Sequence, residues 1–294
     1  MMEHINNAIQ RGQEMLVPSL GPSEHRAAMQ HNTVTNSVPQ GLVRNVAGHS
    51  EPPAGEILRT KHRIDCSKLS STVVCAGSNG SPDNISALEQ YRTLRTKLMD
   101  MAIPNGYRTI MVSSSVPGDG KSLTSLNLAF VFSGIAQIRV LLVEADLHRP
   151  SLSLLLGFNN EANVIDSYIE RPDAWQSCLV SLADNVDCLL AFGQHSLSAE
   201  FIESAAMQEV LIQARANYDL VIIDSPPMLA TADALALVRY CDAALFVVGA
   251  GSTPIKEACR AAELMAGKII GCVLNRVKVT EGEIYYKSYY NRRG

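Results

Sequence analysis

Apolar and polar positions alternate between two patterns from about residue 80 onward. Short apolar runs predict strands at Thr109 to Ser113, Arg139 to Val143, Val186 to Ala191, Leu220 to Asp224, Ala243 to Gly249 and Ile269 to Leu274. Apolar residues at three- and four-residue spacing predict helices at Asn84 to Met101, Ser122 to Gln137, Ala199 to Ala216, Thr231 to Arg239 and Pro254 to Ala266. Because the strands are apolar throughout, both their faces are expected to be covered. The pattern predicts an α/β fold with a doubly wound, mostly parallel sheet.

The first sixty residues have a different pattern. Glu3 to Leu16 has apolar residues near helical spacing, and Pro18 ends it. From Pro18 to Gly55 the composition is rich in Pro, Gly, Ser, Asn and His, which is typical of a linker. We therefore expect three segments: a helix plus linker over 1–60, a catalytic domain over 61–280, and a C-terminal tail over 281–294.

Composition narrows the function classes. The chain has 294 residues, 47% of them hydrophobic and 18% charged, and a net charge of −4, so nucleic acid is not an expected partner. The apolar run from Ala243 to Ala250 is far shorter than the roughly 20 residues of a membrane span. The first ten residues lack a secretory apolar region, so a cytoplasmic location is expected. The seven cysteines include no C-x-x-C pair, which argues against a structural zinc site.

A phosphate-binding loop lies between the first predicted strand and the helix after it. Ser115 to Ser122 reads S-V-P-G-D-G-K-S, with Ser115 in the place of the usual first glycine. Gly118 and Gly120 allow the backbone N–H groups to surround a β-phosphate, and Lys121 would reach the β- and γ-phosphates. Ser122 would supply an oxygen to Mg²⁺. The loop predicts binding of ATP with Mg²⁺.

Carboxylates follow two other predicted strands, as a nucleoside triphosphatase requires. Leu220 to Ile223 leads into Asp224, the expected Walker B acid, and the neighbouring strand is followed by Glu144 and Asp146. Strand alternation would place Glu144 and Asp146 on the same side of the chain. We expect Ser122, Asp146 and Asp224 to hold the metal, and Glu144 or Asp146 to orient the acceptor hydroxyl or take its proton.

Five ordered features resemble the bacterial tyrosine kinases of capsule and exopolysaccharide synthesis, which are deviant Walker P-loop proteins related to the septum-site and partitioning ATPases. The features are the helix motif Glu89 to Arg95, the loop with Pro117, the acidic segment Glu144 to Pro150, the segment Tyr218 to Pro227, and a tyrosine-rich C-terminus. They cover residues 80 to 294. Four of the nine tyrosines (Tyr285, Tyr286, Tyr289 and Tyr290) lie in the last ten residues, in a polar setting suited to phosphoacceptors.

The resemblance implies a cytoplasmic protein-tyrosine autokinase that acts on its tail in trans and regulates polymer synthesis and export. It also implies a separate membrane adaptor at the inner face of the membrane and further cytoplasmic protein substrates. Lys121, Glu144, Asp146 and Asp224 would be the catalytic residues. The nucleotide would be bound by the loop residues Pro117, Gly118, Asp119, Gly120, Lys121, Ser122 and Leu123, with Asn275 and Arg276 near the base.

A charged row on the first predicted helix points to self-association. Glu89, Arg92 and Arg95 lie at three-residue spacing beside the apolar stripe, and intrahelical pairing alone would stabilise them by only a few tenths of a kcal/mol. In the family the same row joins subunits into a ring. We therefore expect a homo-oligomer, with a solvated helix face as the alternative.

The departures from the family pattern leave one alternative open. Glu144 stands where the family has Asp, and His148 replaces the first arginine of the usual pair. Val116 stands where the partitioning branch carries its signature lysine, which argues against that branch. The alternative function is a nucleotide-dependent assembly switch for polysaccharide export without kinase activity. On the family pattern, Glu144→Asp is expected to leave activity unchanged or raise it.

Overall fold

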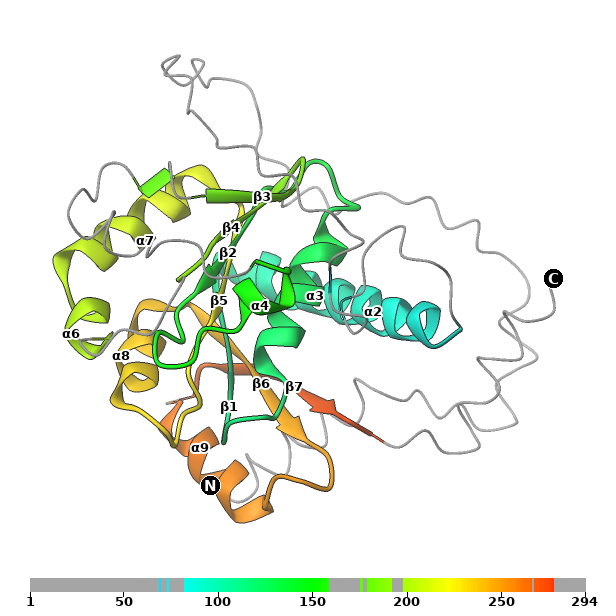
Figure 1. The fold of residues 1–294 in the computed structure, drawn as a ribbon, viewed down its shortest axis with the longest axis vertical. Helices are drawn as coiled ribbons and strands as arrows, with labels where there is room; N and C mark the ends of the chain where they lie inside the picture. Colours follow the sequence, from blue (N-terminus) through cyan, green and yellow to red (C-terminus); the bar gives the residue numbers. More distant parts are fainter. Residues whose placement is uncertain are drawn as a thin grey trace.

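A seven-stranded sheet forms the centre of the molecule in a computed structural model, which describes residues 82–158, 179–191, 198–265 and 267–277 together with 69, 73, 175 and 176. Its strands are β1 (Thr109–Ser114), β2 (Val140–Glu144), β3 (Leu179–Ala183), β4 (Val186–Leu189), β5 (Leu220–Asp224), β6 (Ala243–Gly249) and β7 (Ile269–Asn275). Their spatial order is β3-β4-β2-β5-β1-β6-β7 (Figure 1). All neighbouring pairs are parallel except β3 and β4. The predicted doubly wound, mostly parallel fold is confirmed.

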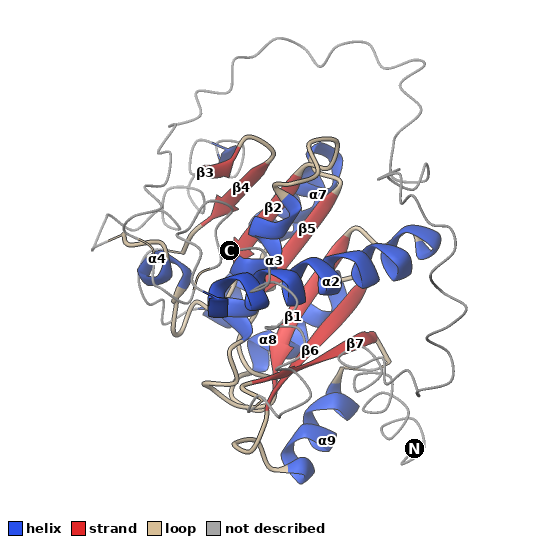
Figure 2. Ribbon diagram, turned by 90° about the vertical axis from the view of Figure 1, so that its right-hand side faces the viewer, coloured by secondary structure: helices blue, strands red, loops and turns tan. Residues whose placement is uncertain are grey.

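Helices cover both faces of this sheet (Figure 2). The helices on one face are α2 (Pro82–Asn105) and α3 (Lys121–Phe132), and those on the other are α6 (Ser198–Ile202), α7 (Ala205–Asn217), α8 (Ala232–Tyr240) and α9 (Ile255–Leu264). Alternation along β1 sends Ile110 and Val112 to the first layer and Met111 to the second. All three side chains are fully buried, which stabilises the fold by about 1.5–3 kcal/mol each.

Besides shifts of a few residues at element ends and an unpredicted short helix over Leu152–Leu155, three elements differ from the sequence predictions. The strand β3 was not predicted; it pairs antiparallel with β4 at the edge of the sheet. The helix predicted over Ala199 to Ala216 is two helices, because the Ser204 hydroxyl accepts a hydrogen bond from Met207 N at 3.3 Å and begins α7 as its N-cap. The helix predicted to reach Gln137 ends at Phe132.

A side chain in the β3–β4 turn holds the end of α3 and the segment after it. Asn185 Nδ2 donates to the carbonyl oxygens of Phe132, Ile135 and Ile138 at 3.2, 2.9 and 2.7 Å. Phe132 O and Ile135 O also accept from Ile135 N and Ile138 N, so Asn185 adds a second donor to these two carbonyls and supplies one to Ile138 O. The segment after α3 is thereby held in a turn that leads into β2.

The strand order brings three strand ends together. β1 lies between β5 and β6, and β5 lies between β1 and β2. In register, Glu144 pairs with Asp224 across β2 and β5, and Val112 pairs with Asp224 across β1 and β5. Ligands of open α/β sheets bind at such carboxyl ends, where a helix N-terminus also points. The short helix α4 (Leu152–Leu155) follows the loop after β2.

Several sequence predictions fall on residues that the structure does not describe. They are the leading helix from Glu3 to Leu16, the linker from Pro18 to Gly55, and the tail tyrosines Tyr285, Tyr286, Tyr289 and Tyr290. The division into three segments therefore stays a prediction. Within the described ranges, no helix is both long and apolar enough to span a bilayer.

Candidate active site

The phosphate loop connects β1 to α3, and its two glycines have backbone conformations that side chains disfavour. Gly118 has φ 90° and Gly120 has φ 96°, both in the left-handed region. Gly120 is also tightly approached, because a Cβ atom there would lie 2.0 Å from Asn275 Nδ2. Pro117 and Gly118 form the exposed tip of the loop. Leu123, in the first turn of α3, is partly buried and packs on the core beneath α2 and α3.

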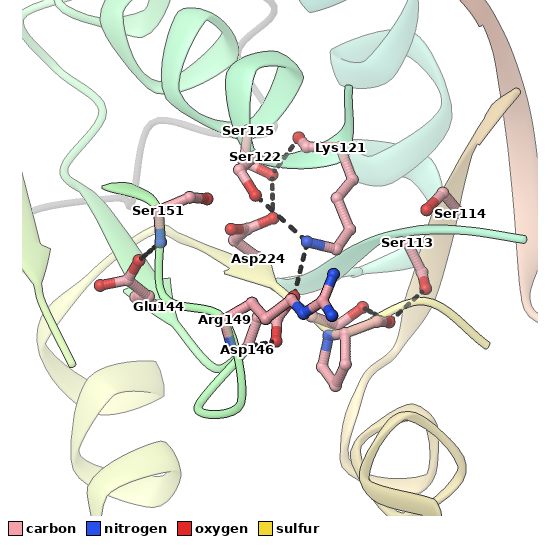
Figure 3. A network of polar contacts seen from close by, with 12 residues as sticks. Ser113, Ser114, Lys121, Ser122, Ser125, Glu144, Asp146, Arg149, Ser151 and Asp224 are labelled. Carbon is pink, nitrogen blue, oxygen red and sulfur yellow. Dashed lines mark hydrogen bonds and ion pairs between the residues drawn. The ribbon is translucent and has the colours of Figure 1, made fainter. Parts of the chain in front are cut away.

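Lys121 begins α3 and points into a group of oxygen atoms (Figure 3). Its Nζ lies 2.7 Å from Asp146 Oδ2 and donates to Ser122 Oγ at 3.2 Å. Burial acts to lower the pKa of Lys121, but the carboxylates of Asp224 and Asp146 outweigh it, so the net shift is upward. The lysine therefore stays charged at the place where phosphates would bind.

Asp224 ends β5 and is fully buried. Its Oδ1 accepts a hydrogen bond from Ser125 Oγ at 3.3 Å, whereas its Oδ2 has no partner within the described part of the chain. Burial raises the pKa of this carboxyl, although Lys121 and the Ser122 hydroxyl act in the opposite direction. A buried carboxylate oxygen without a donor is costly, and a cation bound there would satisfy it.

Asp146 and Glu144 have different partners. β2 ends at Glu144, and Ala145 N donates to Asp224 O at 2.8 Å, which is the ladder bond of the Glu144–Asp224 pair. Asp146 faces Lys121 and accepts a hydrogen bond from Arg149 N at 3.1 Å.

Glu144 is held by backbone N–H groups. Its Oε1 accepts from Ser151 N and Leu152 N, both at 2.6 Å, and its Oε2 accepts from Ala191 N at 2.9 Å. Burial raises its pKa to about 7, against the effect of these three bonds. Both oxygens are thus used to join the loop after β2 to the end of β4.

The acidic loop has a second attachment through His148, the residue that departs from the family pattern. His148 Nε2 lies 3.0 Å from Oδ2 of Asp233, which is 2% exposed in the first turn of α8. The imidazole thus occupies a place beside a buried carboxylate, where the arginine of the family pattern would carry a permanent charge.

Asn275 ends β7 and contacts the phosphate loop, and Arg276 follows it. Asn275 Nδ2 donates to the carbonyl oxygen of Asp119 at 2.8 Å, and Asn275 Oδ1 accepts from Arg276 N at 2.9 Å. Arg276 has a φ of 59°, a left-handed conformation uncommon for a residue with a side chain. Asn275, one of the two residues expected near the base, therefore contacts the loop that would bind the phosphates.

The charged row on α2 is not uniform. Arg92 Nη1 pairs with Glu89 Oε1 at 2.5 Å, and both side chains are exposed. Arg95 instead donates to the carbonyl oxygen of Val131 near the end of α3 and is partly buried. Of the predicted interface residues, Arg95 thus contacts another helix of its own chain, whereas Glu89 and Arg92 pair with each other on α2.

Two residues near the loop were not predicted from the sequence. Ser125 lies one turn after Lys121 on α3, and this spacing was a signal that could have placed its hydroxyl beside Asp224. Thr253, after β6, contacts Asp119 and had no sequence signal. Across the described ranges, no three His, Cys, Asp or Glu side chains are grouped to hold a metal by themselves. A Mg²⁺ site here would draw on Ser122 and on phosphate oxygens as well.

Comparison with known proteins gives a consistent result. Residues 107–250 match the model of a family described as an AAA domain. The chain is 32% identical over 208 residues to tyrosine-protein kinase YwqD of Bacillus subtilis (strain 168), covering 70% of this chain and 86% of that protein. It is 26% identical over 199 residues to the succinoglycan biosynthesis transport protein ExoP of Rhizobium meliloti (strain 1021), covering 66% of this chain but 25% of that protein. The kinase domain of Escherichia coli tyrosine kinase ETK superposes with a TM-score of 0.63 at 27% identity, covering 76% of this chain and 85% of that domain.

Proposed function

The chain belongs to the family of bacterial tyrosine-protein kinases, and we propose that it phosphorylates its own C-terminal tyrosines in trans to regulate polysaccharide synthesis and export. One observation carries the proposal for the site. Lys121 lies 2.7 Å from Asp146 beside the buried Asp224, and all three residues are adjacent to the phosphate loop. Asp146 and Asp224 share Lys121 as a partner. When phosphates bind that lysine, a carboxylate oxygen is therefore free to act as a proton acceptor.

The residues present fit ATP with Mg²⁺. The loop backbone from Pro117 to Gly120 would surround the phosphates, and Lys121 would offset the charge that builds on the leaving group. Ser122 Oγ and the unpartnered Asp224 Oδ2 are the oxygens available to the metal within the described part of the site, with Asp146 close by. When bound, Mg²⁺ neutralises phosphate charge and aligns the β- and γ-phosphates.

Asp146 is the better placed of the two candidate proton acceptors. Its Oδ2 contacts Lys121, so it is released when the lysine turns to phosphate, whereas both oxygens of Glu144 are occupied by backbone N–H groups. In the proposed step a tyrosine oxygen bonds to the γ-phosphorus and the bond to the ADP oxygen breaks. The tyrosine proton passes to Asp146. Glu144 then acts by positioning the loop that carries Asp146.

The proposed partners follow from the family and from the relatives. A relative named as a succinoglycan transport protein supports a place in polysaccharide export. The proposed assembly is a ring in which the tail of one subunit reaches the site of its neighbour. A membrane adaptor would recruit it to the inner face of the membrane, where it would also act on cytoplasmic proteins.

Incubating the purified chain with γ-labelled ATP and Mg²⁺, and assaying for acid-stable phosphate on tyrosine, tests the activity. Mixing two variants tests the trans mechanism. One carries Tyr→Phe at positions 285, 286, 289 and 290 and keeps the active site, and the other is Lys121→Met with an intact tail. Label should appear on the Lys121→Met chain only in the mixture. A mixture without label would exclude phosphorylation in trans, and a wild-type chain without label would favour the assembly switch.

A further inference from the structure

A carboxylate lies inside the phosphate loop, where it would repel a nucleotide. Asp119 stands between Gly118 and Gly120 and is 2% exposed. Phosphate groups bound by the loop would place negative charge close to this side chain, and the interaction is strong where water is excluded. The structure engages the carboxylate elsewhere: Thr253 Oγ1 donates to Asp119 Oδ1, and Val116 N donates weakly to Oδ2 at 3.5 Å.

Thr253 is itself fixed by the connection between β6 and α9. Its Oγ1 accepts a hydrogen bond from Gly249 N at 3.2 Å, so the hydroxyl proton is directed to Asp119. Gly249 leaves the room for this contact, because a Cβ atom there would lie 2.9 Å from Asp119 Oδ1 and 2.4 Å from Ser252 Oγ. The hydroxyl, the glycine and the carboxylate thus fit together without space for a further atom.

Asn275 holds the same residue from the backbone side. Its Nδ2 donates to the carbonyl oxygen of Asp119 at 2.8 Å. Because a trans peptide is planar, the Asp119 carbonyl and the Gly120 N–H point in opposite directions. Fixing the carbonyl toward Asn275 therefore also fixes the direction of a loop N–H group that a phosphate would use.

We propose that Thr253 is a positioning residue for the nucleotide, because it holds the Asp119 carboxylate away from the phosphates and joins the loop to the β6–α9 connection. The inference rests on the proposed function, since it requires the loop to bind ATP and ADP. The inference explains why the Asp119 carboxylate has a hydroxyl partner, which a small neutral residue at this position would not need. Loss of the hydroxyl should release a negative charge toward the phosphates and weaken nucleotide binding.

Binding of a fluorescent ADP analogue with Mg²⁺ to the full chain tests this through a double-mutant cycle. Thr253→Val, which keeps the shape but lacks the hydroxyl, should raise Kd about tenfold, whereas Thr253→Ser should stay within about twofold of wild type. With Asp119→Asn as background, Thr253→Val should change Kd less than about twofold, because no charge is released. In the kinase assay, Thr253→Val should raise the KM for ATP about tenfold and keep kcat within about twofold.

The outcomes separate this inference from the proposed function. A wild-type chain that binds no ADP would overturn both. A wild-type chain that binds ADP, with the same loss from Thr253→Val in the wild-type and Asp119→Asn backgrounds, would keep the kinase and overturn the role of Thr253. Thermal unfolding is followed for every variant, and Thr253→Ala is taken through the same cycle so that the result does not depend on one variant folding.

Discussion

Carboxylates lie at both ends of the sheet, with different partners. At the amino end, Asp242 Oδ2 accepts hydrogen bonds from Arg108 N and Thr109 N, both at 2.8 Å, and its Oδ1 lies 2.9 Å from Arg215 Nη1. Asp219 Oδ2 accepts from Arg139 N at 2.9 Å at the start of β2. At the carboxyl end, Asp224 and Asp146 face Lys121; Asp146 keeps one oxygen on Arg149 N, and one oxygen of Asp224 has no described donor.

The carboxylates at the two ends of the sheet differ in which groups donate hydrogen bonds to them. Backbone N–H groups are fixed by the fold, so a carboxylate that binds them stabilises the strand ends and is unavailable to a ligand. A lysine and hydroxyl groups can turn to a phosphate or a metal, so carboxylates that bind them keep capacity for a substrate. Glu144 lies at the carboxyl end of the sheet, but its hydrogen-bond donors are backbone N–H groups, as at the amino end.

Lys121→Met should have the largest effect. Tyrosine labelling should fall by a factor on the order of 1,000, because Lys121 supplies the charge that would meet the phosphates beside Asp146 and Asp224, and the far-UV circular dichroism should be unchanged. The matched control is Lys268→Met at the amino end, where Nζ donates to Cys241 O at 2.6 Å. Lys268→Met should lower the melting temperature and leave the labelling per folded molecule unchanged. Undiminished labelling by Lys121→Met would disprove the role given to the loop.

Asp224→Asn should lower labelling by a factor on the order of 100 while leaving the melting temperature unchanged or higher. The pKa of Asp224 is raised by burial, so its charged form is disfavoured in the folded state and a neutral side chain of the same shape removes that cost. Differential scanning fluorimetry beside the labelling assay measures both quantities. A lower melting temperature with normal labelling would place Asp224 among the structural carboxylates.

Glu144→Asp is now expected to reduce both stability and activity. The shorter side chain cannot keep contacts of 2.6, 2.6 and 2.9 Å to three separate N–H groups, and each bond lost costs about 1 kcal/mol. Labelling should fall severalfold because the loop carrying Asp146 is loosened. This reverses the expectation taken from the family pattern. An unchanged melting temperature with equal or higher labelling would restore that expectation.

The fold and part of the site were predictable because their signals are local. A strand, a glycine-rich loop and a helix lie in sequence around Lys121, and an apolar strand leads into Asp224. The role of Glu144 was not predictable, because its donors are backbone N–H groups that no residue type encodes. Thr253 stands 134 residues from Asp119 along the chain, so only the folded structure brings them together. The strand β3 was missed because it pairs antiparallel with β4 through a tight turn, with no helix between them, and so departs from the alternation of strands and helices.

Asp242→Asn should destabilise the protein by about 1–2 kcal/mol at pH 7 without lowering labelling per folded molecule. Although burial opposes it, the N–H groups of Arg108 and Thr109 and the Arg215 guanidinium lower the pKa of Asp242 below its ordinary value of 3.8. A depressed carboxyl pKa contributes stability above the unfolded-state pKa, and this contribution is lost as pH falls through the folded-state value. The difference between wild type and variant in urea unfolding should therefore shrink below about pH 4. A pH-independent difference would contradict the assignment.

The smallest effects should separate Arg92 from Arg95 on α2. Arg95 donates to Val131 O near the end of α3, so Arg95→Ala should cost about 1 kcal/mol of stability. Arg92 pairs with the exposed Glu89 on the same helix, and exposed pairs contribute little, so Arg92→Ala should leave the melting temperature unchanged. If α2 forms the proposed ring interface, Arg92→Ala should instead reduce the assembly mass by light scattering and make tail labelling strongly dependent on protein concentration. The double variant should show both effects. If Arg92→Ala leaves the assembly mass and the labelling kinetics unchanged, this face of α2 is a solvated surface. If Arg95→Ala gives a smaller assembly with normal stability, this arginine can leave Val131 for a second subunit.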